Sequence, residues 1–164
     1  MNPVLFLDRD GVINKKREDY VKNIGEFEFL PNIFEAIKKI NNLGITIIVI
    51  TNQSIINRKI ILEDQLNEIH DFMQKKMKEK SCRIAKIYFC PHHPDEKCNC
   101  RKPNTGMIEQ AVKDFNVDLK NSLLIGDSES DIEAANRMKI NSIKLETNGD
   151  LNHLIDNIKE IFFK

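Results

Sequence analysis

The sequence predicts a three-layer α/β fold built on a five-stranded parallel sheet. Short apolar runs of strand length alternate along the chain with longer stretches in which apolar residues recur at helical spacing. The runs contain few polar residues, which is typical of strands buried on both faces of a parallel sheet. The chain has 164 residues, of which 41% are hydrophobic and 30% charged, and these values fit one globular domain. We therefore expect residues 1–164 to form a single domain.

Five apolar runs have the length of a strand. Most of them end at a residue that can carry chemistry or a tight turn: the first at Asp8, the second at Thr51 and the fourth at Gly126. The expected strands cover residues 4–7, 45–50, 84–89, 122–125 and 140–145.

Five further segments show helical periodicity. Pro31 suits the first turn of a helix, and Gly44 suits the position just after its end. Glu63 and Asp64 begin the next helical segment, where carboxylates stabilise the positive end of the helix dipole. The expected helices cover residues 31–43, 62–77, 107–115, 132–138 and 151–162.

Composition excludes several classes of protein. Lys and Arg total 25, as do Asp and Glu, so the formal net charge is zero. This balance argues against a nucleic-acid-binding protein and against a polybasic membrane anchor, since both need net positive charge. The apolar run 45–50 is too short to cross a membrane, and we do not expect the N-terminal MNPVLFLDRDG to be a signal peptide. We expect a cytoplasmic protein whose four cysteines are thiols or metal ligands rather than disulfides.

Polar segments follow the expected strands, and they should meet at one edge of the sheet. In open parallel sheets, ligands bind beyond the carboxyl ends of the strands. The segments are Asp8-Arg9-Asp10-Gly11, Thr51-Asn52-Gln53-Ser54, Arg101-Lys102 and Gly126-Asp127.

Carboxylates dominate these segments. Asp8 and Asp10 stand two residues apart, so both side chains can point toward the same pocket. Two close carboxylates raise each other's pKa unless a cation offsets their repulsion. Asp127 and Asp131 supply further oxygen ligands of the kind that Mg²⁺ prefers, although the role of Asp131 stays open.

Lys102 adds a fixed positive charge and Thr51 a hydroxyl group, which completes the set that phosphoryl transfer needs. The segments FLDRDGVIN, ITNQS, CRKP and IGDSESD resemble, in order and spacing, the four motifs of the haloacid-dehalogenase-like phosphohydrolases. The resemblance covers nearly the whole chain and implies that family's Rossmann-like fold and its aspartyl-phosphate intermediate. The stretches between the motifs are short, so no separate cap domain is expected.

The resemblance also implies a role for each motif residue. Asp8 would be the nucleophile, and Asp10 would be the general acid/base. Thr51 and Lys102 would hold the phosphoryl group. Asp127 would bind Mg²⁺ together with Asp8 and the backbone carbonyl of Asp10. The residues expected to bind the rest of the substrate are Asn52, Gln53, Ser54, Arg101 and Ser128.

The loop after the third strand contains two closely spaced groups of metal ligands, CPHHP and CNC. Three thiolates and one imidazole suit tetrahedral Zn²⁺ in a closed structural site. The expected zinc ligands are Cys90, His92, Cys98 and Cys100, with His92 selected by the family resemblance. His93 is then expected to be free to approach the substrate. The alternative is that these cysteines are incidental small residues.

We expect no catalytic or metal-binding role for the remaining cysteine and the two remaining histidines. Cys82 lies outside the loop and is expected to be a plain structural thiol. His70 and His153 lie in helical segments and are expected to be ordinary surface or boundary residues.

A zinc-binding loop narrows the resemblance to two groups, the D-glycero-D-manno-heptose 1,7-bisphosphate phosphatases and the histidinol-phosphate phosphatases. The segments DYV, TNQS and the GM step after Lys102 are more similar to the heptose group. The short stretch between His92 and Cys98 is more similar to the histidinol group, and residues 55–58 lack the glycines usual in the heptose group. Arg101 would contact the second polar or phosphate group of the substrate, and Ser128 stands where the family often has Lys.

The sequence therefore predicts a monomeric, Mg²⁺-dependent phosphomonoesterase with structural zinc that acts on a small phosphorylated sugar in heptose and lipopolysaccharide synthesis. Histidinol-phosphate hydrolysis is the alternative reaction. A signalling receiver domain is a rival class, but it would accept phosphate after its third strand, where this chain has Cys90, and Asp10 favours turnover. A zinc-loop module that binds nucleic acid or a protein is disfavoured by the zero net charge.

Overall fold

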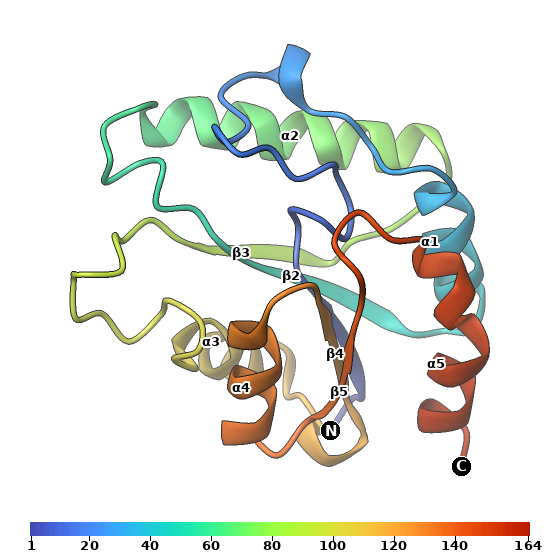
Figure 1. Cartoon of the computed structure of the whole chain (residues 1–164). Coiled ribbons are helices and arrows are strands. Elements are labelled where there is room, and N and C mark those ends of the chain that lie inside the picture. Colours follow the sequence, from blue (N-terminus) through green and yellow to red (C-terminus); the bar gives the residue numbers. More distant parts are fainter.

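The computed structural model describes all 164 residues, and it contains the expected sheet. Five parallel strands pair in the order β3-β2-β1-β4-β5 (Figure 1). Their bounds are β1 Val4–Leu7, β2 Thr46–Asn52, β3 Lys86–Cys90, β4 Leu123–Gly126 and β5 Asn141–Lys144. No helix of the chain is both long enough and apolar enough to span a bilayer.

Helices cover both faces of the sheet, as Figure 1 shows. Helices α1 (Ile33–Asn42), α2 (Glu63–Glu79) and α5 (Ile155–Phe162) pack on one face, and α3 (Gly106–Phe115) and α4 (Glu129–Arg137) pack on the other. Strand β1 explains why two cores form: Leu5 and Leu7 point into the first, whereas Val4 and Phe6 point into the second. All four side chains are fully buried, as expected for the central strand of a parallel sheet.

Most elements lie within three residues of their expected bounds, and two of the differences bear on the fold. Strand β2 continues through Thr51 and Asn52, because these residues pair with Phe89 and Cys90 of β3 beyond the apolar run. The C-terminal helix is divided into a 3₁₀ turn, Leu151–Leu154, and α5. The Asp150 side chain accepts the backbone N–H of Asn152 and so caps the 3₁₀ turn.

The strand order places a crevice at the carboxyl ends of β1 and β4. From β1 the chain builds β2 and β3 on one side and then crosses back to add β4 and β5 on the other. The connections therefore leave β1 and β4 in opposite directions, which is where open α/β sheets bind ligands. Asp8 and Asp127 directly follow these two strands and therefore lie at the crevice.

Candidate active site

A cluster of carboxylates lies at this crevice. Asp8 follows β1, Asp127 follows β4, and Asp131 comes from the first turn of α4. One carboxylate oxygen from each lies within 4.8 Å of the others. The backbone allows this approach because a Cβ atom at Gly126 would lie 2.2 Å from Cγ of Asp131, so only glycine fits there.

Lys102 is buried among these carboxylates. Its Nζ lies 3.0 Å from Oδ1 of Asp8 and 2.5 Å from Oδ1 of Asp131, and it donates a 2.8 Å hydrogen bond to the carbonyl of Ile50. Burial raises the pKa of Asp8 to about 7, because it outweighs the opposing charge of Lys102. One lysine is therefore not enough to hold the whole cluster ionised, and the site favours a further cation.

Asp127 provides an open ligand position for such a cation. Its Oδ2 accepts hydrogen bonds from Lys16 and Thr147, both at 2.9 Å, whereas its buried Oδ1 has no partner. An oxygen-only set of donors with an unpartnered carboxylate oxygen fits a hard divalent cation such as Mg²⁺. Gly11 lies against the same carboxylate with φ +85°, and a Cβ atom there would come within 2.4 Å of Oδ2.

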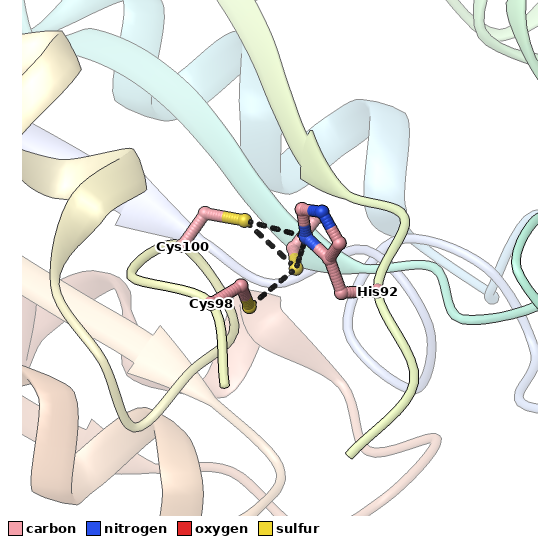
Figure 2. A group of neighbouring side chains, drawn as sticks. His92, Cys98 and Cys100 are labelled. Carbon is pink, nitrogen blue, oxygen red and sulfur yellow. Dashed lines mark hydrogen bonds between the residues drawn. The ribbon is translucent and has the colours of Figure 1, made fainter. Parts of the chain in front are cut away.

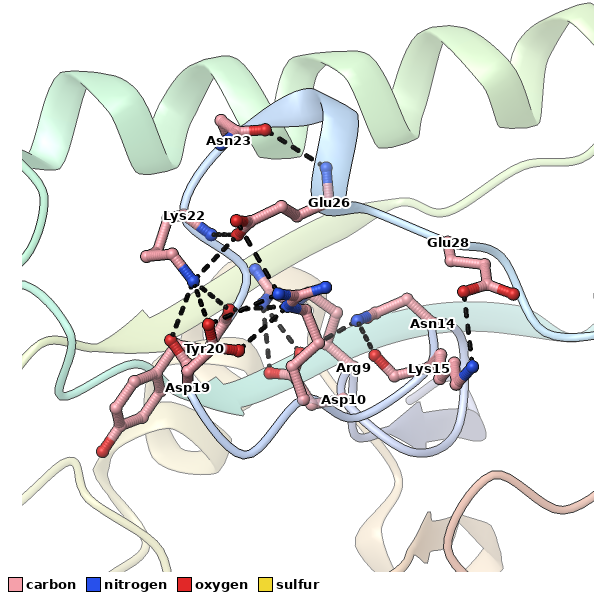
Figure 3. A network of polar contacts seen from close by, with 11 residues as sticks. Arg9, Asp10, Asn14, Lys15, Asp19, Tyr20, Lys22, Asn23, Glu26 and Glu28 are labelled. Atoms are coloured by element: carbon pink, nitrogen blue, oxygen red, sulfur yellow. Dashed lines mark hydrogen bonds and ion pairs between the residues drawn. The ribbon is translucent and has the colours of Figure 1, made fainter.

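Asp10 lies in a different environment from Asp8. Its Oδ1 accepts hydrogen bonds from Arg9 and Asn14 at 2.9 Å each (Figure 3). Its Oδ2 accepts one from Gln53 at 2.7 Å. Burial raises the pKa of Asp10, but the Arg9 charge and these donors outweigh it and hold the pKa below its usual value. Without a further cation, Asp8 therefore tends to hold a proton and Asp10 tends to be ionised. A cation beside Asp8 would lower the pKa of Asp8 and favour its charged form.

The end of β2 and the segment that follows it connect the site to the loop that carries Lys102. Thr51 is fully buried and its hydroxyl accepts a 2.9 Å hydrogen bond from Gln53. Asn52 accepts the backbone N–H of Lys102 at 3.0 Å and donates to the Lys102 carbonyl at 3.1 Å. Ser54 accepts a 3.2 Å hydrogen bond from Arg58. These contacts hold the lysine-bearing loop against the end of β2.

A cavity of about 290 Å³ opens above the carboxylates, and only two of its 16 lining residues are hydrophobic. Five residues expected to bind substrate line it: Asn52, Gln53, Ser54, Arg101 and Ser128. Thr51 is fully buried and is not among the lining residues. Four cationic side chains form what we call the basic rim: Lys16, Arg17, Arg58 and Arg101. Such a surface suits a small ligand that carries more than one negative charge.

The four expected zinc ligands form a second cluster (Figure 2). Nδ1 of His92 lies 3.4 Å from Sγ of Cys90 and 3.2 Å from Sγ of Cys100. Sγ of Cys90 lies 3.7 Å from Sγ of Cys98 and 2.9 Å from Sγ of Cys100. Two sulfurs on tetrahedral zinc lie about 3.8 Å apart, given Zn–S bonds of about 2.3 Å, so the first pair has that spacing and the second would open by about 1 Å around the metal. The backbone N–H of Arg101 points at Sγ of Cys98, at 3.3 Å. None of the cysteines forms a disulfide, so the cluster fits a tetrahedral metal.

The expectation about His70 is wrong. His70 is not a surface or boundary residue: it is only 6% exposed, and its Nε2 lies 3.0 Å from Nη1 of Arg9. His93 is not among the residues that line the cavity. Its Nδ1 accepts the backbone N–H of Asp95 at 3.2 Å, and its own backbone N–H donates to Glu96, so its approach to the substrate stays a prediction. His153 is exposed and Cys82 is a buried thiol, so both of these expectations are confirmed.

Three residues of the site were not predicted from the sequence. Arg9 is the largest of the fully buried side chains, Asn14 has no exposed surface, and Lys16 reaches Asp127 from the loop after β1. Lys and Asn are frequent in this chain, so their type alone carries no signal. Arg9 could have been found from its position between the two motif aspartates.

This fold and site define a haloacid-dehalogenase-like hydrolase. The HAD-hydrolase-like family model matches residues 99–158, which include Lys102, Asp127 and Asp131. The chain is 45% identical to the D-glycero-alpha-D-manno-heptose-1,7-bisphosphate 7-phosphatase of Photorhabdus laumondii, over 84% of this chain and 78% of that protein. It is 40% identical to the enzyme of the same name from Campylobacter jejuni, over 98% of this chain and 95% of that one. The chain belongs to the heptose-1,7-bisphosphate 7-phosphatase family of haloacid-dehalogenase-like phosphatases.

A solved structure agrees with this membership. The D,D-heptose 1,7-bisphosphate phosphatase from B. bronchiseptica, crystallised with magnesium and phosphate, matches with a TM-score of 0.87 and 29% sequence identity. The match covers 98% of this chain and 99% of that one. The fold class expected from the sequence is therefore confirmed, and the chain is a phosphoric monoester hydrolase by family.

Proposed function

We propose that this single phosphatase domain removes the 7-phosphate from D-glycero-D-manno-heptose 1,7-bisphosphate in a Mg²⁺-dependent reaction. The observation that carries the proposal is the buried cluster in which Asp8, Lys102 and the unpartnered Oδ1 of Asp127 meet below the cavity. Asp8, Asp127 and the backbone carbonyl of Asp10 would hold Mg²⁺, which would neutralise charge on the phosphoryl oxygens.

The residues support a two-step reaction. A carboxylate oxygen of Asp8 attacks phosphorus, and the bond from phosphorus to the sugar oxygen breaks while Asp10 donates a proton to that oxygen. Asp10, now ionised, takes a proton from a water molecule whose oxygen attacks the aspartyl phosphate. Phosphate leaves and Asp8 is regenerated. Lys102 and Thr51 stabilise the charge on the phosphoryl oxygens in both steps.

The basic rim supports a substrate with a second phosphate. Arg58 lies with its guanidinium 5.9 Å from the ring centre of Tyr20, and its Nε donates to Ser54, so its position above the cavity is fixed. Histidinol phosphate carries a single phosphate and a cationic amine, which the rim would repel. The short stretch between His92 and Cys98 keeps it as the second candidate.

Phosphate release from both substrates tests the proposal. We expect the purified protein with Mg²⁺ to hydrolyse the heptose bisphosphate at least about tenfold more efficiently than histidinol phosphate, a difference of about 1.4 kcal/mol in transition-state binding. Equal or reversed efficiencies would assign the protein to the second candidate. No phosphate release from either compound would remove the proposed function altogether.

Arg101 is proposed to recognise the distal phosphate. Arg101→Ala should raise KM for the bisphosphate about tenfold or more with little change in kcat, because the lost contact is made equally in the ground and transition states. The KM for a small generic phosphate ester should change much less. Steady-state kinetics on both esters decides this, and an equal loss on both would contradict the assigned role.

The Cys/His cluster is proposed to hold structural zinc. Freshly purified protein should contain about one zinc per chain, and mild chelation should remove Mg²⁺-dependent activity but leave this zinc bound. Cys98→Ser should lower the zinc content and the melting temperature. Cys82→Ser, which alters a buried thiol outside the cluster, is the matched control and should keep its zinc. A zinc-free wild type would refute the site. A cytoplasmic location, where thiols stay reduced, suits four cysteines that form no disulfide, and we propose it together with a monomeric state.

A further inference from the structure

Arg9 places a permanent positive charge inside the protein. Its side chain is 1% exposed, and arginine remains protonated even when buried. One end amine, Nη2, donates to both oxygens of Asp10 at 2.9 and 3.1 Å, and the other, Nη1, lies 3.0 Å from Nε2 of His70. The guanidinium carbon lies 5.7 Å from the ring centre of Phe27, while Nε has no partner. Its two end amines therefore fix its orientation.

The chemistry of the contact assigns the protonation state of His70. Arginine can only donate hydrogen bonds, so Nε2 of His70 must accept one and the ring must be neutral. Burial, with the Arg9 charge added to it, lowers the pKa of His70 to about 3, which agrees with a neutral ring. The centre of the His70 ring also lies 5.8 Å from the centre of the Phe89 ring in β3. His70 is thus a fixed acceptor supplied by α2.

We propose that His70 is a positioning residue for the reaction: it orients Arg9, and Arg9 in turn aims the Asp10 carboxylate at the oxygen of the leaving group. The inference rests on the proposed function, in which Asp10 is the general acid. It adds α2, which carries none of the motif residues, to the catalytic apparatus.

The contacts of Asp10 explain why this position matters. Asn14 and Gln53 each hold one oxygen of the carboxylate, and Arg9 alone bonds to both. Without an acceptor at residue 70, Nη1 would be a buried donor without a partner, which costs about 1–3 kcal/mol. The guanidinium would regain a partner by rotating, and the carboxylate bonded to Nη2 would turn with it. A misaimed acid loses much of its catalytic effect.

Two esters distinguish this role from a merely structural one. Departure of a sugar alkoxide needs a proton from Asp10, whereas 4-nitrophenolate leaves without one. The alkyl ester is the heptose bisphosphate or histidinol phosphate, whichever the wild type hydrolyses faster. The measured quantity is kcat/KM, which reports the steps up to release of the leaving group.

His70→Phe keeps an aromatic ring but removes the acceptor. We expect its kcat/KM to fall at least about tenfold on the alkyl ester and less than about threefold on 4-nitrophenyl phosphate. His70→Gln, which can place an amide oxygen near the position of Nε2, should restore most of the loss. His153→Phe, at an exposed histidine, is the control and should behave as wild type. If His70→Phe does not fold, His70→Met takes its place.

Equal losses on both esters, no loss on either, or a failure of His70→Gln to restore activity would overturn the proposal while leaving the proposed function intact. A wild type that hydrolyses neither alkyl ester would overturn the proposed function itself, and this inference with it.

Discussion

Asp8→Asn is expected to lower phosphate release at least about 1,000-fold, because the amide cannot attack phosphorus. Asparagine has nearly the same shape as aspartate, so the site should otherwise be preserved. Steady-state phosphate release with Mg²⁺ measures the loss. Activity within tenfold of wild type would contradict the assignment of Asp8 as the nucleophile.

The same variant should not lose stability. Burial raises the pKa of Asp8 to about 7, and Asp131 and Asp10 add repulsion to its charged form. Replacing it with a neutral amide removes that repulsion, so the melting temperature should stay equal or rise. Asp156→Asn, on the outer surface of α5 where the side chain is 92% exposed, is the matched control and should change neither quantity. A large drop in the melting temperature of Asp8→Asn would mean that activity was lost through unfolding.

Lys102→Met is expected to lower both activity and stability. Lys102 is 2% exposed, and its ammonium group compensates the Asp8 and Asp131 carboxylates. Removing one partner of a buried charge cluster costs about 3–5 kcal/mol in the free energy of unfolding. Loss of a charge that stabilises the transferred phosphoryl group should reduce kcat about 100- to 1,000-fold on any phosphate ester.

Urea unfolding and kinetics on two esters measure these effects. Lys144→Met is the matched control, because Lys144 pairs with Glu129 at the surface and its side chain is 48% exposed. Surface ion pairs contribute about 0–1 kcal/mol, so this variant should be nearly unchanged. If Lys102→Met were as stable and as active as the control, the lysine would not be the cation that compensates the cluster.

Local patterns were sufficient to predict most of the fold. Strand β1 begins and ends as expected, because its apolar run stops abruptly at Asp8. Strand β2 was expected to end at residue 50, but it continues through Thr51 and Asn52. Polar residues at a strand end carry no local sign of pairing, and here their partners come from β3, nearly 40 residues further along the chain.

The candidate site, like the fold, was predicted only in part from the sequence. The structure brings Asp8, Lys102 and Asp127 together, as their positions after strands and in motifs predicted. The Arg9–His70 contact was not predicted, because it joins residues 61 positions apart and buries an arginine, a residue type that is usually exposed. Periodicity indicated that His70 lies on a helix, but only the packing of α2 on the loop after β1 shows which side chain it meets.

The central claim is that Asp8 carries the phosphoryl group during turnover, and acid quenching tests it most directly. Protein mixed with the heptose bisphosphate and Mg²⁺ is quenched within the first turnover, digested and examined by mass spectrometry. Asp10→Asn is measured beside the wild type with 4-nitrophenyl phosphate, whose leaving group needs no proton from Asp10, because the loss of the base should then slow only the breakdown of the intermediate. The account predicts one phosphoryl group on the peptide that contains Asp8 and none in Asp8→Asn. A phosphoryl group on another residue, or steady hydrolysis with no phosphorylated Asp8 at any quench time in either protein, would contradict it.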